Sequence, residues 1–190
     1  YDLSGTMGMN YLQSAHVELV LNGVYAGNYQ LVGNVRIDNG RVDIFDWEDC
    51  AGDAAKAIRK AHSDTLTKAD QDLLEDYLVE NMSWITSQNG VTWRGVTYPR
   101  ADYESVVPKD AAGNVDVSGG FLFELDGYYD EVSRFKTAYD QPFMFKSPEF
   151  IAPVTSNNYA NCQELADYAK NYIQAVENSV HADDYYLSLI

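Results

Sequence analysis

Basic residues are scarce in this chain. Its 13 Lys and Arg stand against 29 Asp and Glu, which gives a formal net charge of -16. Nucleic acids and anionic membranes are bound through cationic patches, so this balance disfavours both kinds of partner. The same balance fits an extracellular or secreted protein, or a protein that binds cations.

Cysteine and histidine are also rare. The two cysteines, Cys50 and Cys162, match no metal-binding spacing and are too few for a disulfide framework. We expect two small buried or free thiols, with a single bridge between them as the alternative. The histidines, His16, His62 and His181, lie far apart in the sequence, so we expect surface or half-buried side chains rather than metal ligands.

Long apolar runs and common catalytic motifs are missing as well. No stretch approaches the ~20 apolar residues that a membrane-spanning helix needs. The chain contains no repeat, no low-complexity segment, no GxSxG, no Walker loop and no Cys/His nucleophile pair. Its 190 residues, 46% of them hydrophobic, are nevertheless enough for one domain with a sizeable core.

The most regular pattern runs from residue 16 to residue 44. Asn22-Gly23 joins two extended runs, and Asn-Gly favours a type I′ hairpin because both turn residues need a positive φ. We predict strands at about 16–22, 27–35 and 41–44, the last after the turn Asp38-Asn39-Gly40. Alternation places Val17, Leu19 and Leu21 on one face, and His16, Glu18 and Val20 on the other.

Helical patterns occupy three other regions. The spacing predicts helices over 54–61, 68–84 and 159–181, with Thr67 as the N-cap and Gln71 near the third position of the second helix. Asn158 is the predicted cap of the third helix. The acidic group Asp46, Glu48, Asp49 and Asp53 is either a cation site or the start of a helix, and the helix dipole favours the second reading.

The remaining segments divide into strands and an irregular region. Residues 91–118, with Pro99, Pro108 and Gly113, predict a long surface excursion or insertion. Short strands are expected at 121–125, 134–139 and 143–146. Residues 183–190 look like the beginning of another apolar element, so we expect the chain to be part of a larger domain. No initiator Met precedes Tyr1, so we expect either a removed leader or a trimmed start.

Two stretches together resemble one known family. Residues 17–31, VELVLNGVYAGNYQL, and residues 119–149, GGFLFELDGYYDEVSRFKTAYDQPFMFKSPE, are similar to the CotH family of spore-coat and secreted bacterial proteins. Members of that family look like distant, atypical protein kinases. The resemblance covers about half of the chain, and residues 45–118 correspond to a region that the family varies, here expected to be a partly helical insertion.

The resemblance implies a fold and a set of binding residues. The fold would be α+β, an antiparallel sheet with packed helices, kinase-like and incomplete at its C-terminal end, with a second lobe beginning near residue 159. The hairpin from Gly23 to Gly27 would cover ATP, and the segment 121–126, with Glu124, Leu125 and Asp126, would hold adenine through its backbone. Turn chemistry for the glycines, and a plain solvent-facing role for Glu124 and Asp126, are the alternatives.

The resemblance also implies an activity. It predicts a secreted or coat-associated kinase that transfers phosphate from ATP to Ser or Thr of extracellular or coat proteins, using a divalent cation (Mg, Mn or Ca). The family's Glu-Lys pair is replaced here by Gly33-Asn34, and Arg36 is the candidate substitute on the same strand face as Asn34. The family's metal motif would lie beyond Ile190, so the catalytic and metal residues stay unassigned. The alternative is a non-catalytic binding, adhesion or cellulosome-associated module, with calcium as its candidate ligand.

Overall fold

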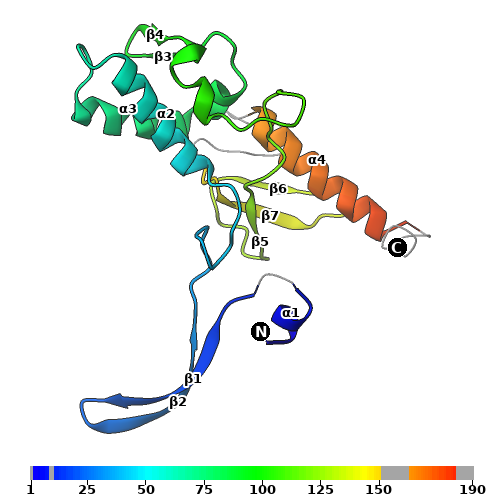
Figure 1. The fold of residues 1–190 in the computed structure, drawn as a ribbon. Helices are drawn as coiled ribbons and strands as arrows, with labels where there is room; N and C mark the ends of the chain where they lie inside the picture. Colours follow the sequence, from blue (N-terminus) through cyan, green and yellow to red (C-terminus); the bar gives the residue numbers. More distant parts are fainter. Residues whose placement is uncertain (1, 9–10, 151–162, 183–190) are drawn as a thin grey trace. The chain divides into compact units, whose positions relative to one another are not determined.

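A computed structural model describes residues 2–8, 11–150 and 163–182 of the chain. The chain forms two compact units, Tyr1–Phe45 and Asp46–Ile190. Each unit is described by itself, and Figure 1 labels the elements of both. Among the described residues, no helix is long and apolar enough to cross a membrane.

The first unit is built on the predicted hairpin. It contains a short helix α1 (Asp2–Thr6) and the antiparallel strands β1 (Ser14–Leu21) and β2 (Val24–Val32). Asn22 and Gly23 have φ values of 52° and 80°, both positive as a type I′ turn requires. Val17 pairs with Tyr29 and His16 with Gln30, so the expected alternation gives one largely apolar and one largely polar face.

Two expectations for this unit are wrong. The second strand begins at Val24 and ends at Val32, where the expected run was 27–35. Residues 41–44 form no strand, because Val42 makes only an isolated bridge to Ile37 across the turn at Asp38. The turn residues fold back locally and leave no third strand for the hairpin to pair with.

The second unit opens with two helices that lie against each other, α2 (Trp47–Ala61) and α3 (Lys68–Glu80). The Asp46 carboxylate accepts hydrogen bonds from the backbone N–H groups of Glu48 and Asp49. The acidic group therefore starts a helix, which is the alternative that the helix dipole favoured. The helix therefore begins seven residues before Ala54, since Trp47 rather than Ala54 is its first residue. Thr67 caps α3 as predicted, but its capping-box partner is Asp70 and not Gln71.

Residues 91–107 are packed into the core and are not a surface excursion, which corrects the sequence prediction for that part, whereas residues 108–118 are exposed or half-buried. The 3₁₀ helix η1 (Met82–Ile85) leads into a hairpin of β3 (Val91–Trp93) and β4 (Val96–Tyr98), followed by η2 (Arg100–Asp102) and η3 (Glu104–Val106). Five apolar side chains of this region are buried in the core with α2 and α3: Val91, Trp93, Tyr98, Tyr103 and Val107. Polar residues dominate the sequence of this region, and the aromatic side chains Trp93, Tyr98 and Tyr103 turn inward.

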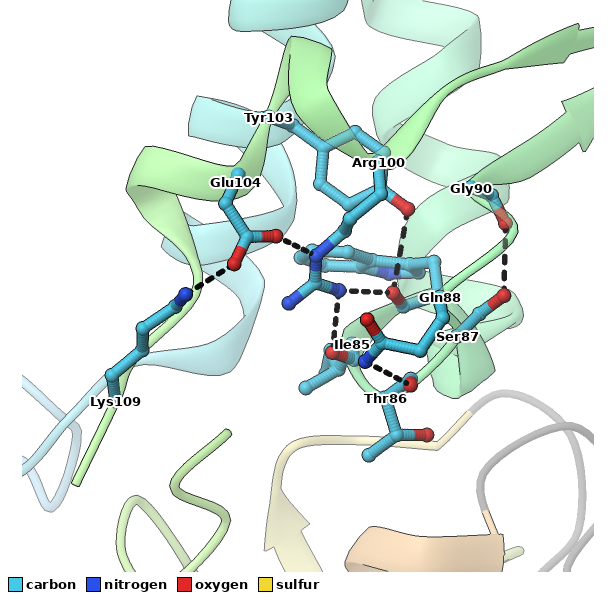
Figure 2. Close-up of polar contacts among 10 residues, drawn as sticks. Ile85, Thr86, Ser87, Gln88, Gly90, Arg100, Tyr103, Glu104 and Lys109 are labelled. Carbon is cyan, nitrogen blue, oxygen red and sulfur yellow. Dashed lines mark hydrogen bonds and ion pairs between the residues drawn. The ribbon is translucent and has the colours of Figure 1, made fainter. Parts of the chain in front are cut away.

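Arg100 holds this region together. Its Nη1 donates to the carbonyl oxygens of Trp84 and Ile85, and its Nε donates to the Glu104 carboxylate, which also binds Lys109 (Figure 2). A buried guanidinium is costly unless it is paired and hydrogen-bonded; here Nε and Nη1 have partners, and Nη2 has none among the described residues. The η2 turn is thereby fixed to the end of η1.

Two of the residues singled out in the sequence lie nearby. His62 ends α2 and is half-buried, as expected, with its Nε2 2.7 Å from Asp102 Oδ2. Cys50 is a buried free thiol whose Sγ donates to the Val106 carbonyl oxygen at 3.4 Å. Cys162 lies outside the described residues.

The rest of the unit is a small sheet covered by one helix. The strands β5 (Leu122–Leu125), β6 (Arg134–Lys136) and β7 (Pro142–Ser147) form an antiparallel sheet in the order β5-β7-β6. The helix α4 (Gln163–Val180) runs beside it (Figure 1), and the predicted start at 159 lies outside the described residues. The architecture is α+β with small antiparallel sheets, the coarse class that the sequence predicts.

Candidate functional site

The sheet β5-β7-β6 presents a polar face on which the predicted residue Glu124 lies. Glu124 pairs with Met144 across the β5–β7 ladder, and Arg134 pairs with Met144 from the other side. Side chains of directly paired residues lie on the same side of a sheet. Glu124, Met144 and Arg134 therefore share one face.

Lys146 is the central charge of this face. Its ammonium lies 3.5 Å from Glu124 Oε2 and also binds the Glu131 carboxylate. The side chains of all three residues are only partly exposed, at 35% for Lys146, 42% for Glu124 and 39% for Glu131. The hydrogen bond to Glu131 raises the pKa of Lys146, so the ammonium stays protonated over the physiological pH range.

The β5–β7 ladder is irregular at Lys146. Leu122 pairs with Ser147 and Phe123 pairs with Phe145, so Lys146 is the extra residue of a β-bulge. Bulges re-aim a side chain and occur beside functional sites. Here the bulge leaves the Lys146 side chain on the polar face with both glutamates.

Glu131 is positioned by the connection between β5 and β6. Arg134 donates from Nη1 to the carbonyl oxygens of Tyr129, at 2.7 Å, and Glu131, at 3.2 Å. The Arg134 guanidinium also lies 4.9 Å above the centre of the Tyr129 ring. This clamp fixes the backbone that carries Glu131 toward Lys146.

The other two predicted residues of β5 have different surroundings. Leu125 is 58% exposed and ends the strand. Asp126 accepts a hydrogen bond from the Tyr128 backbone N–H at 2.9 Å, which is turn chemistry. Among the described residues β5 is an edge strand, so the outer side of its backbone is not used by the sheet.

The predicted residues of the first unit are described within that unit. Gly23 completes the type I′ turn, and Gly27, with φ 120°, follows a register shift opposite Leu19 and Val20. Arg36 is bound by Asp38, its Nη2 donating to Oδ2 at 2.6 Å. Because β2 ends at Val32, Arg36 and Asn34 do not share a strand face, and that expectation is wrong. Within this unit, the predicted residues Gly23, Gly27 and Arg36 thus do not come together in one site.

The opposite face of the sheet carries an aromatic cluster. Phe123 pairs with Phe145, and Phe135 pairs with Phe143, so these rings face away from Glu124 and Lys146. Phe121 stacks on Tyr168 of α4, with ring centres 6.1 Å apart. A cavity of about 300 Å³ remains between this face and α4, lined by Ser118, Gly119, Gly120, Phe121, Phe123, Tyr168, Ala169, Tyr172 and Ile173.

Two residues of the polar face were missed in the sequence. Lys146 and Glu131 are separated by fifteen positions, and no short motif links them. The only sequence signal is the period-two spacing that places Lys146 on the same strand face as Met144, and it does not identify the partner strand. Among the described residues, no group of three or more His, Cys, Asp or Glu side chains could hold a metal ion.

Comparisons with protein-family models, with curated proteins and with solved structures each find no match to this chain. The CotH resemblance therefore stays a prediction from the two sequence stretches.

Proposed function

We propose that this chain is the nucleotide-binding part of a CotH-like protein kinase, which transfers phosphate from ATP to Ser or Thr of extracellular or coat proteins. The observation that supports the proposal is the ion pairing of Lys146 with Glu131 and Glu124 on one sheet. Protein kinases require a strand lysine that pairs with a glutamate and contacts the phosphates of ATP. Lys146 supplies the charge, and the glutamates orient it.

The surroundings of Lys146 are compatible with this role. The β5 strand beside it has an outer backbone edge that can hydrogen-bond a base, as the resemblance implies for residues 121–126. Among the described residues, no group of three or more His, Cys, Asp or Glu side chains could hold Mg, Mn or Ca. The proposal therefore assigns no step and no residue to a cation.

The proposal is tested by replacing Lys146 with a neutral side chain of similar length. Lys146→Met removes the charge, and Lys136→Met is the matched control, since Lys136 lies on the neighbouring strand and pairs with Asp140 at 2.7 Å. Charge-assisted hydrogen bonds contribute about 1.5–3 kcal/mol, so Lys146→Met should weaken ATP binding more than about tenfold in calorimetry. Lys136→Met should leave ATP binding unchanged.

Labelled ATP with a divalent cation then tests transfer to the chain itself or to a coat-type protein. The absence of ATP binding by the unaltered chain would contradict the proposal. Equal losses of ATP binding in the Lys146 and Lys136 variants would show that general charge, and not a defined site, attracts the nucleotide.

A second candidate is a non-catalytic binding module on the same scaffold. It is favoured because both side chains proposed to bind the phosphates of ATP already form ion pairs. Arg36 pairs with Asp38, and Lys146 pairs with Glu124 and Glu131. Thermal unfolding separates the two functions. A rise in melting temperature with calcium and none with ATP supports the binding module, and the reverse supports the kinase.

A further inference from the structure

The cavity between β5 and α4 has walls made of aromatic rings. Successive rings lie nearly parallel: Phe123 and Phe121 at 20°, Phe121 and Tyr168 at 21°, and Tyr168 and Tyr172 at 16°, with centres 6.1–6.2 Å apart. These are offset stacks, the arrangement that aromatic rings prefer. The array therefore offers flat ring faces in a common orientation.

One end of this array is open to solvent. Tyr172 is 58% exposed, whereas Ala169 in the middle of the lining is buried. At the other end, Gly119 has no neighbouring heavy atom within 4 Å of the place where a Cβ would stand, so this rim is open as well. The rim is held in place, because Trp47 Nε1 of α2 donates to the Gly119 carbonyl oxygen at 2.9 Å. The cavity is thus accessible and has a fixed wall.

The chemistry of the lining selects the ligand. None of the nine lining residues carries a charged side chain, in a chain whose net charge is -16. A phosphate or carboxylate would lose its hydration there without a cationic group in the lining, because Lys170 of α4 lies over the Phe135 ring and does not line the cavity. Lys146 is on the opposite face of the sheet, so it does not contribute to this cavity.

We propose that this cavity binds a small, uncharged ligand through a planar aromatic ring, which stacks on the array between Phe121 and Tyr172. The volume of about 300 Å³ is at the lower end of the range for small-molecule sites. This site is separate from the nucleotide site proposed at Lys146 and does not depend on it.

The test compares two ligands that share one skeleton. The probe is 2-naphthol, which is flat, neutral at pH 7 and fluorescent, and its control is decahydro-2-naphthol, which has the same skeleton and hydroxyl group but is saturated and not flat. Calorimetry with the full chain should show binding of 2-naphthol at least about twofold tighter than of the saturated compound, because an aromatic pair adds roughly 0.5–1.5 kcal/mol beyond burial. Equal affinities, or no binding of 2-naphthol, would overturn the proposal.

Matched variants place the ligand in the cavity. Tyr172→Leu and Phe121→Leu each remove one ring and keep an apolar side chain, so each should weaken 2-naphthol binding roughly two- to tenfold. Tyr128→Leu is the control, since Tyr128 is 85% exposed and does not line the cavity. Tyr172 is largely exposed, so its replacement leaves the fold intact and keeps the test valid if Phe121→Leu fails to fold. An unchanged affinity in Tyr172→Leu would overturn the proposal.

A further variant separates this site from the proposed nucleotide site. Lys146→Met should leave 2-naphthol binding unchanged even where it removes ATP binding. Circular dichroism checks that the Lys146→Met variant keeps its fold. A loss of 2-naphthol binding in the folded variant would contradict the proposal that the two sites are independent.

Discussion

Arg100 Nη1 donates to the carbonyl oxygen of Trp84 at 2.9 Å, across sixteen positions of the sequence. The same nitrogen donates to the Ile85 carbonyl oxygen at 2.6 Å. The Arg100 guanidinium carbon also lies 5.3 Å from the centre of the Tyr103 ring. These contacts are buried, and they fix the region that the sequence alone marks as irregular.

Replacement of Arg100 should therefore be costly. Arg100→Met removes the Arg100 donor from the buried Ile85 carbonyl and leaves the Trp84 carbonyl only the Tyr103 hydroxyl at 3.5 Å, which should lower the free energy of unfolding by about 2–4 kcal/mol. Arg94→Met is the control, because Arg94 is 56% exposed and pairs with Asp70 at the surface. Urea unfolding should show a loss below about 1 kcal/mol for Arg94→Met. Similar losses in both variants would contradict the structural role of Arg100.

Two glycines with similar backbone angles should respond differently to alanine. Gly90 and Gly95 have φ values of 87° and 79°, so a Cβ strains both by about 1 kcal/mol. At Gly90 the added Cβ would also lie 2.0 Å from the Tyr98 carbonyl oxygen, whereas at Gly95 it meets no heavy atom within 4 Å. Gly90→Ala should thus destabilise the chain by on the order of 3 kcal/mol, and Gly95→Ala by about 1 kcal/mol. Equal midpoints in urea would show that the β3–β4 hairpin is not packed as described.

The capping box of α3 predicts a loss of stability and a pH dependence. Thr67→Ala should lower the free energy of unfolding by about 1 kcal/mol, with Lys68→Ala as a near-neutral control on the exposed side. The hydrogen bond from the Thr67 hydroxyl, more than the nearby Arg94, lowers the pKa of Asp70 below 3.8. The contribution of this carboxylate is therefore present above pH 3.8 and is lost as the pH falls below it. Asp70→Asn should remove that part of the acid dependence in urea titrations, and an unchanged acid profile would contradict the role of the cap.

The buried thiol of Cys50 should be unreactive in the folded chain. Burial, more than the charge of Asp53, raises the pKa of Cys50 from 9.0 to about 12, and the thiolate is the reactive form. Between these pH values the unfolded chain loses the proton and the folded chain keeps it, so stability should fall as the pH rises from 9.0 toward 12. Iodoacetamide at pH 8 should modify Cys50 in urea but not in buffer, as read by peptide mass spectrometry. Equal rates in the two conditions would exclude a buried thiol.

The sequence by itself determined the local features. Asn22-Gly23 fixed the hairpin turn because only a few residues adopt a positive φ easily, and Thr67 marked a helix start because its hydroxyl reaches a backbone N–H three residues away. The sheet strands near 121–125 and 143–146 were predicted for a similar reason, since apolar runs bounded by turn residues are local signals. Each of these features depends on residues within one turn or one strand.

The tertiary structure alone decided the candidate sites and the core around Arg100. The pairing of Lys146 with Glu131 and Glu124 depends on a bulge and on the order of strands, and the aromatic cavity depends on where α4 lies on the sheet. Five apolar side chains of residues 91–107 are buried because they find partners in the core formed with α2 and α3. These contacts join residues far apart in the chain, and their free energy comes from burial and pairing that no local pattern in the sequence contains.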